Sequence, residues 1–199
     1  MRNLSLLILL VAALGLDAIA INPPGTKKVK VDKEIIYVDQ EEIIVADWME
    51  YVHYVEHRYG KDSEELMSAY PEGIASKEAI AKEKLTKPIT GITLEQAKKY
   101  CEWRTDVVNS VNAENGLGLV SYSLPTEEQY AKLLKTFGCY EILSDKNKTE
   151  RLTGLQSSVY ELTAEGSVLK NNSVFSKEEN IPNSNIGFRC VAIFVKQKK

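Results

Sequence analysis

The sequence predicts an α+β fold in which a few helices combine with short strands. Residues 93–96 and 126–129 both read Thr-x-x-Gln, the pattern of a capping box, in which two side chains satisfy backbone N–H groups at a helix N-terminus. Residues 44–59 carry apolar side chains at helical spacing. Segments of strand-like composition lie at residues 28–38, 157–163, 167–169 and 187–195. Together they predict about three helices and several short strands.

The first twenty residues predict a signal peptide. A nearly continuous apolar run of 13 residues, 4–16, follows Arg2. That length is short for a membrane span and typical of the apolar centre of a signal peptide. Residues 18–20 read Ala-Ile-Ala, so we expect cleavage after Ala20 and a periplasmic or secreted protein. An uncleaved N-terminal anchor is the alternative, and no later apolar run predicts a transmembrane segment in the cleaved chain.

The part of the chain after this leader predicts a linker, a strand and a helix. Residues 21–27 contain two adjacent prolines and are expected to form a linker. Charged residues alternate with valine and isoleucine over 28–38, which predicts a strand. The helix over 44–59 is expected to end at Gly60. Its apolar side chains are Val45, Trp48, Met49, Val52 and Val55.

The remaining chain predicts two further helices joined by irregular segments. The charged region 61–87 is expected to be an excursion with one short helix, and it is a candidate partner surface. Helices are expected to begin at the two capping boxes and to end near Val111 and Phe137. We expect one domain over residues 28–196, followed by a basic tail at 197–199.

Composition excludes several classes of function. The 199 residues include 25 Lys and Arg and 28 Asp and Glu, a net charge of −3, which disfavours general nucleic-acid binding because phosphates need a basic face. Two histidines exclude any site with three histidine ligands. Three cysteines, Cys101, Cys139 and Cys190, allow one disulfide in an oxidising compartment and leave one thiol. Their spacing alone does not decide which two pair.

Five segments, in order, resemble motifs of the sulfatase-modifying factor family, also called the formylglycine-generating enzyme domain. They are residues 42–48 (EIIVADW), 88–103 (PITGITLEQAKKYCEW), 124–130 (LPTEEQY), 158–163 (SVYELT) and 185–190 (NIGFRC). The resemblance covers about residues 34 to 192. It implies a C-type-lectin-like fold with short twisted antiparallel sheets, about three helices and much irregular loop.

The resemblance also implies roles for individual residues. In the family, the cysteines that match Cys101 and Cys190 form a disulfide. Here the bridge would close a loop of about 90 residues and contribute on the order of 4 kcal/mol in the chain-entropy model. Cys139 would then be the unpaired thiol, which we expect to be a small buried apolar group. The motif positions expected to be structural are Trp103, Pro125, Thr126, Glu127, Tyr160, Glu161, Gly187, Phe188 and Arg189.

The chain departs from the family where the chemistry of the active members is located. Those members bind copper through two reactive cysteines between a Gly-Gly-Ser motif and the closing Gly-Phe-Arg-Cys. Here Asn171 and Asn172 replace the two glycines, and no cysteine lies between Val174 and Gly187. A copper–thiolate site cannot form without thiolates. We therefore assign no catalytic or cofactor-binding residue.

The sequence thus favours an exported, non-catalytic member that binds or assembles with a protein or another cell-envelope component. A divergent enzyme of the formylglycine-generating type with altered chemistry is the alternative. Family enzymes take calcium ligands from the stretch after the third motif. Asp145, Asn147 and Glu150 lie there, but their spacing is not that of an EF-hand, so calcium stays an option and no cofactor is assigned.

Residues 53–57 add a competing pattern, His-x-x-Glu-His, found in inverted zinc proteases. On a helix, His53 and His57 would lie one turn apart and could bind one Zn²⁺, with Glu56 activating a water molecule. A zinc hydrolase is therefore the third alternative. The pattern is short and no motif marks a third ligand, so we assign no metal and expect these side chains to lie on a solvated helix face.

Overall fold

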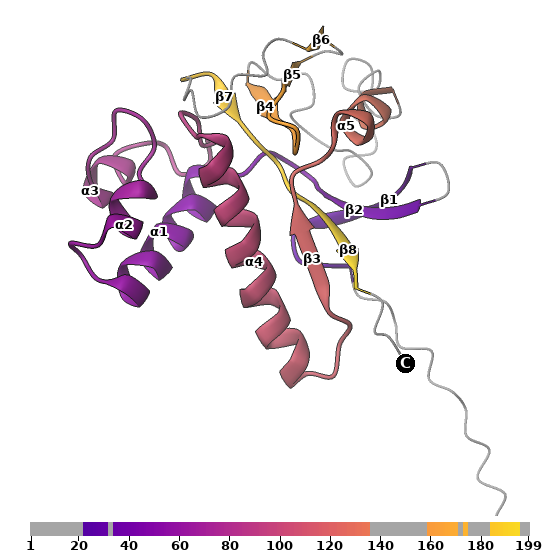
Figure 1. The fold of residues 1–199 in the computed structure, drawn as a ribbon, viewed down its shortest axis with the longest axis horizontal. Coiled ribbons are helices and arrows are strands. Elements are labelled where there is room, and N and C mark those ends of the chain that lie inside the picture. Colours follow the sequence, from indigo (N-terminus) through magenta and orange to yellow (C-terminus); the bar gives the residue numbers. More distant parts are fainter. Residues whose placement is uncertain (1–21, 32–33, 136–158, 171–172, 175–183, 196–199) are drawn as a thin grey trace, which may run out of the picture.

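The computed structural model describes residues 22–31, 34–135, 159–170, 173–174 and 184–195. Within these residues the chain has an α+β fold of five helices and two four-stranded sheets. Figure 1 shows the three N-terminal helices grouped on one side of the longest helix, with the first sheet on its other side. The α+β fold class predicted from the sequence is therefore confirmed.

The first sheet joins the two ends of the described chain. Its order is β1-β2-β8-β3, and every pairing is antiparallel. The strands are β1 (Thr26–Val31), β2 (Glu34–Asp39), β8 (Val191–Phe194) and β3 (Val120–Ser123). Because β2 pairs with β8, the N-terminal hairpin is fixed against the last strand of the fold.

The second sheet is smaller and follows the order β6-β5-β4-β7. Its strands are β6 (Ser173–Val174), β5 (Val168–Lys170), β4 (Tyr160–Leu162) and β7 (Ile186–Gly187). The β4–β7 pairing is parallel, which differs from the antiparallel sheets that the family resemblance implies.

Two strand predictions need correction. The expected single strand over 28–38 is two strands, with Thr26 opposite Asp39 across the β1–β2 pair. The apolar alternation continues through both strands, which is why the sequence did not separate them. The expected strand over 187–195 is divided between β7 in one sheet and β8 in the other.

Three helices begin where the sequence predicts; the first ends before Gly60 as expected, and the longest extends beyond its expected end near Val111. The helices are α1 (Val45–Tyr59), α2 (Glu64–Ser68), α3 (Lys77–Ile80), α4 (Leu94–Glu114) and α5 (Glu127–Leu133). Both capping boxes are present, with Thr93 accepting from the Gln96 N–H and Thr126 from the Gln129 N–H. The 61–87 excursion holds two short helices where one was expected. No helix in the described residues is long and apolar enough to cross a membrane.

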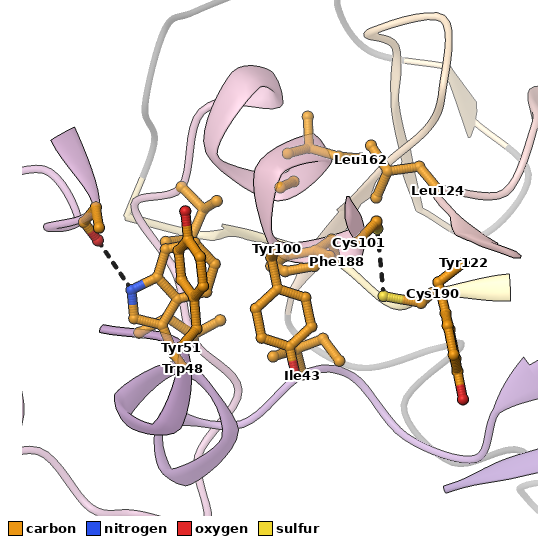
Figure 2. Close-up of a cluster of buried hydrophobic side chains, with 14 of the residues drawn as sticks. Ile43, Trp48, Tyr51, Tyr100, Cys101, Tyr122, Leu124, Leu162, Phe188 and Cys190 are labelled. Carbon is orange, nitrogen blue, oxygen red and sulfur yellow. Dashed lines mark hydrogen bonds between the residues drawn. The ribbon is translucent and has the colours of Figure 1, made fainter. Parts of the chain in front are cut away.

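An aromatic cluster forms the centre of the core (Figure 2). Trp48 of α1 stacks on Tyr100 of α4, with ring centroids 5.6 Å apart, and meets Phe188 edge-on at 6.0 Å. Tyr51 packs against both Trp48 and Tyr100. Such pairs contribute more than their buried area alone. The cluster therefore fixes α1 and α4 against the segment that leads into β8.

Candidate functional site

Two motif segments that are far apart in the sequence meet in a buried ion pair. Glu161 of β4 and Arg189, just before β8, are both fully buried. Arg189 Nε donates to Glu161 Oε2 at 2.6 Å and Arg189 Nη2 donates to Glu161 Oε1 at 2.7 Å, a bidentate arrangement. Tyr130 also hydrogen-bonds Glu161, and burial raises the pKa of this carboxyl while Arg189 acts in the opposite direction. The pair links the second sheet to the first.

Two cysteines lie side by side next to this pair. The sulfurs of Cys101 and Cys190 are 3.4 Å apart, and both residues are buried free thiols (Figure 2). Burial raises the pKa of the Cys190 thiol, so this sulfur is uncharged and not a nucleophile. A disulfide needs an S–S distance of about 2.05 Å. The disulfide between these two residues stays a prediction.

A cavity of about 610 Å³ opens beside this core. Its walls come from the end of β2, the segment that follows it, the first half of α1 and the middle of α4. This volume lies within the range of about 300–1,000 Å³ typical of ligand pockets. Tyr100, Trp103, Val107 and Val108 of α4 form its apolar wall.

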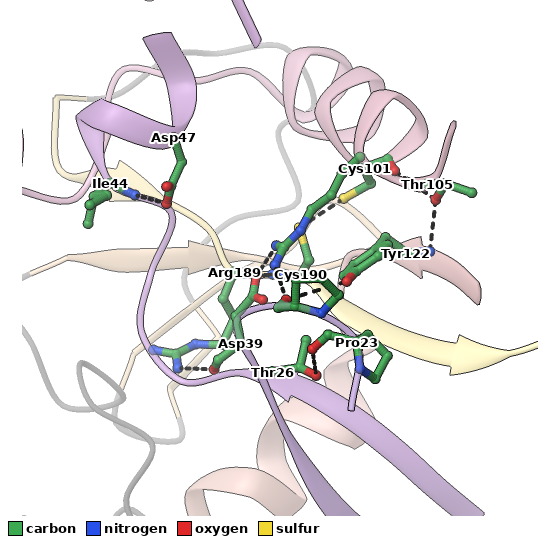
Figure 3. A network of polar contacts seen from close by, with 12 residues as sticks. Pro23, Thr26, Asp39, Ile44, Asp47, Cys101, Thr105, Tyr122, Arg189 and Cys190 are labelled. Atoms are coloured by element: carbon green, nitrogen blue, oxygen red, sulfur yellow. Dashed lines mark hydrogen bonds and ion pairs between the residues drawn. The ribbon is translucent and has the colours of Figure 1, made fainter. Parts of the chain in front are cut away.

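A second carboxylate–arginine pair lines the cavity. Arg104 Nη1 donates to Asp39 Oδ2 at 2.8 Å, and Arg104 Nη2 donates to the Pro24 carbonyl at 2.8 Å. The Cys190 N–H also donates to Asp39 Oδ2, at 2.9 Å (Figure 3). The Arg104 guanidinium lies over the Tyr122 ring, 4.4 Å from its centroid. Burial raises the pKa of the Asp39 carboxyl, and Arg104 acts against that increase.

Two buried polar atoms of cavity-lining residues have no hydrogen-bond partner in the part of the chain that the structure describes. They are Asp39 Oδ1, an acceptor, and Trp103 Nε1, a donor. The other tryptophan differs, because Trp48 Nε1 donates to the Ala69 carbonyl at 3.1 Å. Trp103 also lines a second cavity of about 230 Å³. Buried polar groups in proteins are nearly always paired, so unpaired atoms on two residues that line the first cavity indicate a place where a ligand or water completes the structure.

The cavity is strongly acidic. Besides Asp39, its lining includes Glu41, Glu42, Asp47 and Glu50, and among the described residues Arg104 is the only basic one that lines it. Glu42 lies 3.8 Å from the buried Arg189, and Asp47 accepts from the Ile44 N–H at the start of α1. Glu41 and Glu50 are exposed and make no ion pair within the described residues.

The sequence did not identify this cavity. Asp39 and Arg104 are 65 residues apart, and each lies within an ordinary amphipathic element, the end of β2 and the middle of α4. The one local signal is the acidic stretch Asp-Gln-Glu-Glu at residues 39–42, directly between a strand and a helix. A run of carboxylates between two predicted elements marks a charged loop, but it does not indicate which helix covers it.

The His-x-x-Glu-His pattern lies on α1, as expected. Lys77 of α3 donates to Glu56 Oε2 at 2.6 Å, and its Nζ lies 3.1 Å from His53 Nδ1. This contact lowers the pKa of Glu56. His53 and His57 are exposed. In the described residues no group of three or more His, Cys, Asp or Glu side chains is arranged to hold a metal ion.

Other motif residues have structural contacts. Thr126 caps α5, and its neighbour Glu127 accepts a hydrogen bond from the Ser167 hydroxyl. A side chain at Gly187 would place its Cβ 2.7 Å from the Ile89 carbonyl oxygen, so this close backbone approach requires glycine. The carbonyl oxygen of Pro125 accepts a hydrogen bond from the Ala164 N–H. Phe188 is fully buried, and Trp103 and Tyr160 are partly buried against the core.

Several predicted positions lie outside the described residues. These are the signal peptide, Cys139, Asn171, Asn172, and the calcium candidates Asp145, Asn147 and Glu150. Comparison of the chain with protein-family models, with curated proteins and with solved structures finds no match. The geometry of the chain's own residues is therefore the basis for a functional proposal.

Proposed function

We propose that this chain is an exported, non-catalytic binding domain with the C-type-lectin-like fold of the sulfatase-modifying factor family. The observation that carries the proposal is the buried, bidentate pair of Glu161 and Arg189. The two residues belong to the fourth and fifth family-like segments, and a common scaffold requires such segments to meet in one core. Short sheets beside two long helices are in keeping with that fold.

The chemistry of the active family members has no counterpart in these cysteines. Two of the three, Cys101 and Cys190, are buried side by side, and the Cys190 thiol is uncharged because burial raises its pKa. Only Cys139 remains. A copper site of the family type needs two reactive thiolates, and one cysteine cannot supply them. Binding is therefore favoured over cysteine oxidation.

The acidic cavity supplies a site for the binding role. It combines a ligand-sized volume, an apolar wall from α4 and several carboxylates. A partner group that enters it would contact residues from three separate elements at once. We propose that the partner is a protein or another component of the cell envelope, which matches the expected export of the chain.

A direct assay tests the non-catalytic part of the proposal. The purified protein is loaded with Cu(I) and incubated in air with a cysteine-containing sulfatase peptide, and the peptide is followed by mass spectrometry. We expect no conversion of cysteine to formylglycine. Conversion that disappears in Cys139→Ser would overturn the proposal in favour of the divergent enzyme.

Site-specific cross-linking tests the binding part. A photo-reactive amino acid replaces Glu50, which lines the cavity, or Glu114, which is exposed at the far end of α4. We expect illumination of the cells that export the protein to give a discrete adduct from position 50 and none from position 114. Equal labelling from both positions, or from neither, would contradict a binding role for the cavity.

N-terminal sequencing of the exported protein tests the expected cleavage after Ala20, and the sequence should begin at Ile21.

A further inference from the structure

The negative charge of the cavity determines which charge a ligand must carry. Five carboxylates and one arginine line it, and that arginine is committed to Asp39 and to the Pro24 carbonyl. Glu41 and Glu50 stand exposed at the opening without an ion pair in the described part of the chain. A cation that enters gains attraction from these groups, whereas an anion is repelled.

The unpaired atoms specify the ligand further. Asp39 is 4% exposed, and its Oδ1 needs a donor. Trp103 Nε1 needs an acceptor. A free amine or guanidinium supplies donors only. A basic residue within a polypeptide supplies both groups, because its side chain carries N–H donors and its backbone carries carbonyl acceptors.

We propose that the cavity binds a lysine or arginine side chain of a partner polypeptide. The cationic group lies among the carboxylates near Asp39, and a carbonyl of the same peptide accepts from Trp103 Nε1. The aliphatic part of the side chain packs on the apolar wall formed by Val107 and Val108. This inference rests on the proposed binding function and names the chemistry that the binding site recognises.

The side chains that line this part of the cavity are less deeply buried than the corresponding side chains of the core. Trp103 and Arg104 are only partly buried, in contrast to Trp48 and Arg189, which have no exposed surface. Arg104 is covered on one side by Gly25, where a Cβ would lie 3.0 Å from Arg104 Nη2.

The indole N–H of Trp103 gives a direct readout. The chain has two tryptophans, so a ¹H–¹⁵N spectrum of the purified protein shows two indole signals, and Trp103→Phe identifies the one from Trp103. The probe is the blocked tripeptide acetyl-Gly-Lys-Gly-amide, with its arginine and norleucine counterparts. We expect the Trp103 signal to move downfield and to saturate with the lysine or arginine peptide. The Trp48 signal, whose N–H already has a partner, should stay in place.

Charge variants separate the proposed site from general attraction to an acidic protein. The double variant Glu41→Gln/Glu50→Gln removes two exposed cavity carboxylates, and we expect it to raise the dissociation constant about three- to tenfold. The matched control Glu64→Gln/Glu114→Gln removes two exposed carboxylates outside the cavity and should leave it unchanged. Sodium chloride at 0.5 M should also weaken binding, because it screens exposed charges.

Three results would overturn the proposal. They are no shift with either basic peptide, an equal shift with the norleucine peptide, and equal weakening by the two double variants. Free n-butylamine tests the source of the cation, and a shift of Trp103 as large as that with the lysine peptide would overturn the polypeptide assignment. If the peptides fail while cross-linking from position 50 succeeds, the cation inference is wrong and the binding function stands.

Discussion

Within the described residues, two buried carboxylate–arginine pairs are joined by hydrogen bonds, and they differ in how many of their polar atoms have a partner. In the pair of Glu161 and Arg189, both carboxylate oxygens accept from the guanidinium, and neither residue has exposed surface. In the pair of Asp39 and Arg104, one carboxylate oxygen has no partner, and the arginine is partly exposed. The first arrangement suits a structural connection. The second leaves a hydrogen-bonding group available beside a cavity.

The two pairs are linked through one short stretch of backbone. Arg189 Nη1 donates to the Asp39 carbonyl at 3.2 Å, and the Cys190 N–H donates to the Asp39 carboxylate at 2.9 Å (Figure 3). The complete pair therefore fixes the position of the incomplete one. A rigid core that holds one side of an open cavity is the arrangement expected of a binding site that must not change shape when it is empty.

Matched substitutions of Arg189 and Arg104 should give the largest difference in the free energy of unfolding. Arg189→Met leaves Glu161 buried without its partner, and we expect a loss of about 3–5 kcal/mol in the free energy of unfolding. Arg104→Met should cost about 1–3 kcal/mol, because Arg104 is partly exposed. Urea denaturation at pH 7, followed by circular dichroism, measures both. Arg58→Met, at an exposed position of α1, is the control and should change stability by less than about 0.5 kcal/mol.

The stability of the Arg104→Met variant should also depend on pH more strongly than that of the unchanged protein, with a known sign. Arg104 lowers the pKa of Asp39, so its removal raises that pKa further above the ordinary value of 3.8. The folded state then binds a proton more tightly than the unfolded state does. The variant should therefore be most stable at or below that ordinary value and lose stability as the pH rises. The distinction between the two carboxylate–arginine pairs would be contradicted if both arginine variants lost equal free energy of unfolding and Arg104→Met showed no such pH dependence.

Formation of a disulfide between Cys101 and Cys190 should give the next largest change in stability. Cys101 and Cys190 are 89 residues apart, so oxidation to the predicted disulfide should stabilise the fold by about 2–4 kcal/mol relative to the reduced protein. Denaturation with and without reductant measures the difference. Peptide mapping without reduction should join the two cysteine peptides. Cys190→Ser should abolish the difference and Cys139→Ser should leave it unchanged. A disulfide that includes Cys139 would disprove the pairing.

Local signals explain which parts of this fold the sequence could predict. The starts of α4 and α5 were predicted because Thr93 and Thr126 each form a capping box within four residues. The expected end of this last helix at Phe137 lies outside the described residues, whereas α4 extends to Glu114, beyond its expected end near Val111. Strand β3 was missed because its four residues are too few to show a period.

Long-range contacts explain what the sequence could not predict in the candidate site. Asp39 is the last residue of a strand and Arg104 lies in a helix, and nothing near either residue in the sequence indicates the other. The family resemblance named Glu161 and Arg189 separately, but their pairing became visible only in the structure. Trp103 was expected to be a core residue, yet it is partly buried and its Nε1 is unpaired. Hydrogen-bond satisfaction is a property of the folded chain, and no local pattern encodes it.

The two tryptophans also differ in whether a buried polar atom has a hydrogen-bond partner, and their substitution should change stability less than that of the arginines. Trp48→Phe leaves the Ala69 carbonyl without its donor in a buried place, and we expect a loss of about 1–3 kcal/mol. Trp103→Phe removes an N–H that has no partner within the described residues and keeps an aromatic ring beside Tyr51 and Tyr100, so the loss of stability should stay below about 1 kcal/mol. Thermal unfolding of the two single variants under identical conditions measures both. A larger loss for Trp103→Phe than for Trp48→Phe would show that the Trp103 N–H is satisfied in the free protein.

The smallest expected effect concerns the ion pair between α1 and α3. Lys77 lowers the pKa of Glu56 below its ordinary value of 4.5, so the folded state favours the ionised carboxylate. The contribution of this pair to stability is therefore present above pH 4.5 and is lost as the pH falls through the lowered pKa. Carboxyl NMR titration should give a Glu56 pKa below 4.5 in the native protein and a higher one in Lys77→Met. The double variant Glu41→Gln/Glu50→Gln alters only the cavity and should leave the Glu56 titration unchanged. An identical Glu56 pKa with and without Lys77 would show that this contact does not persist, and would leave Glu56 available to the flanking histidines His53 and His57.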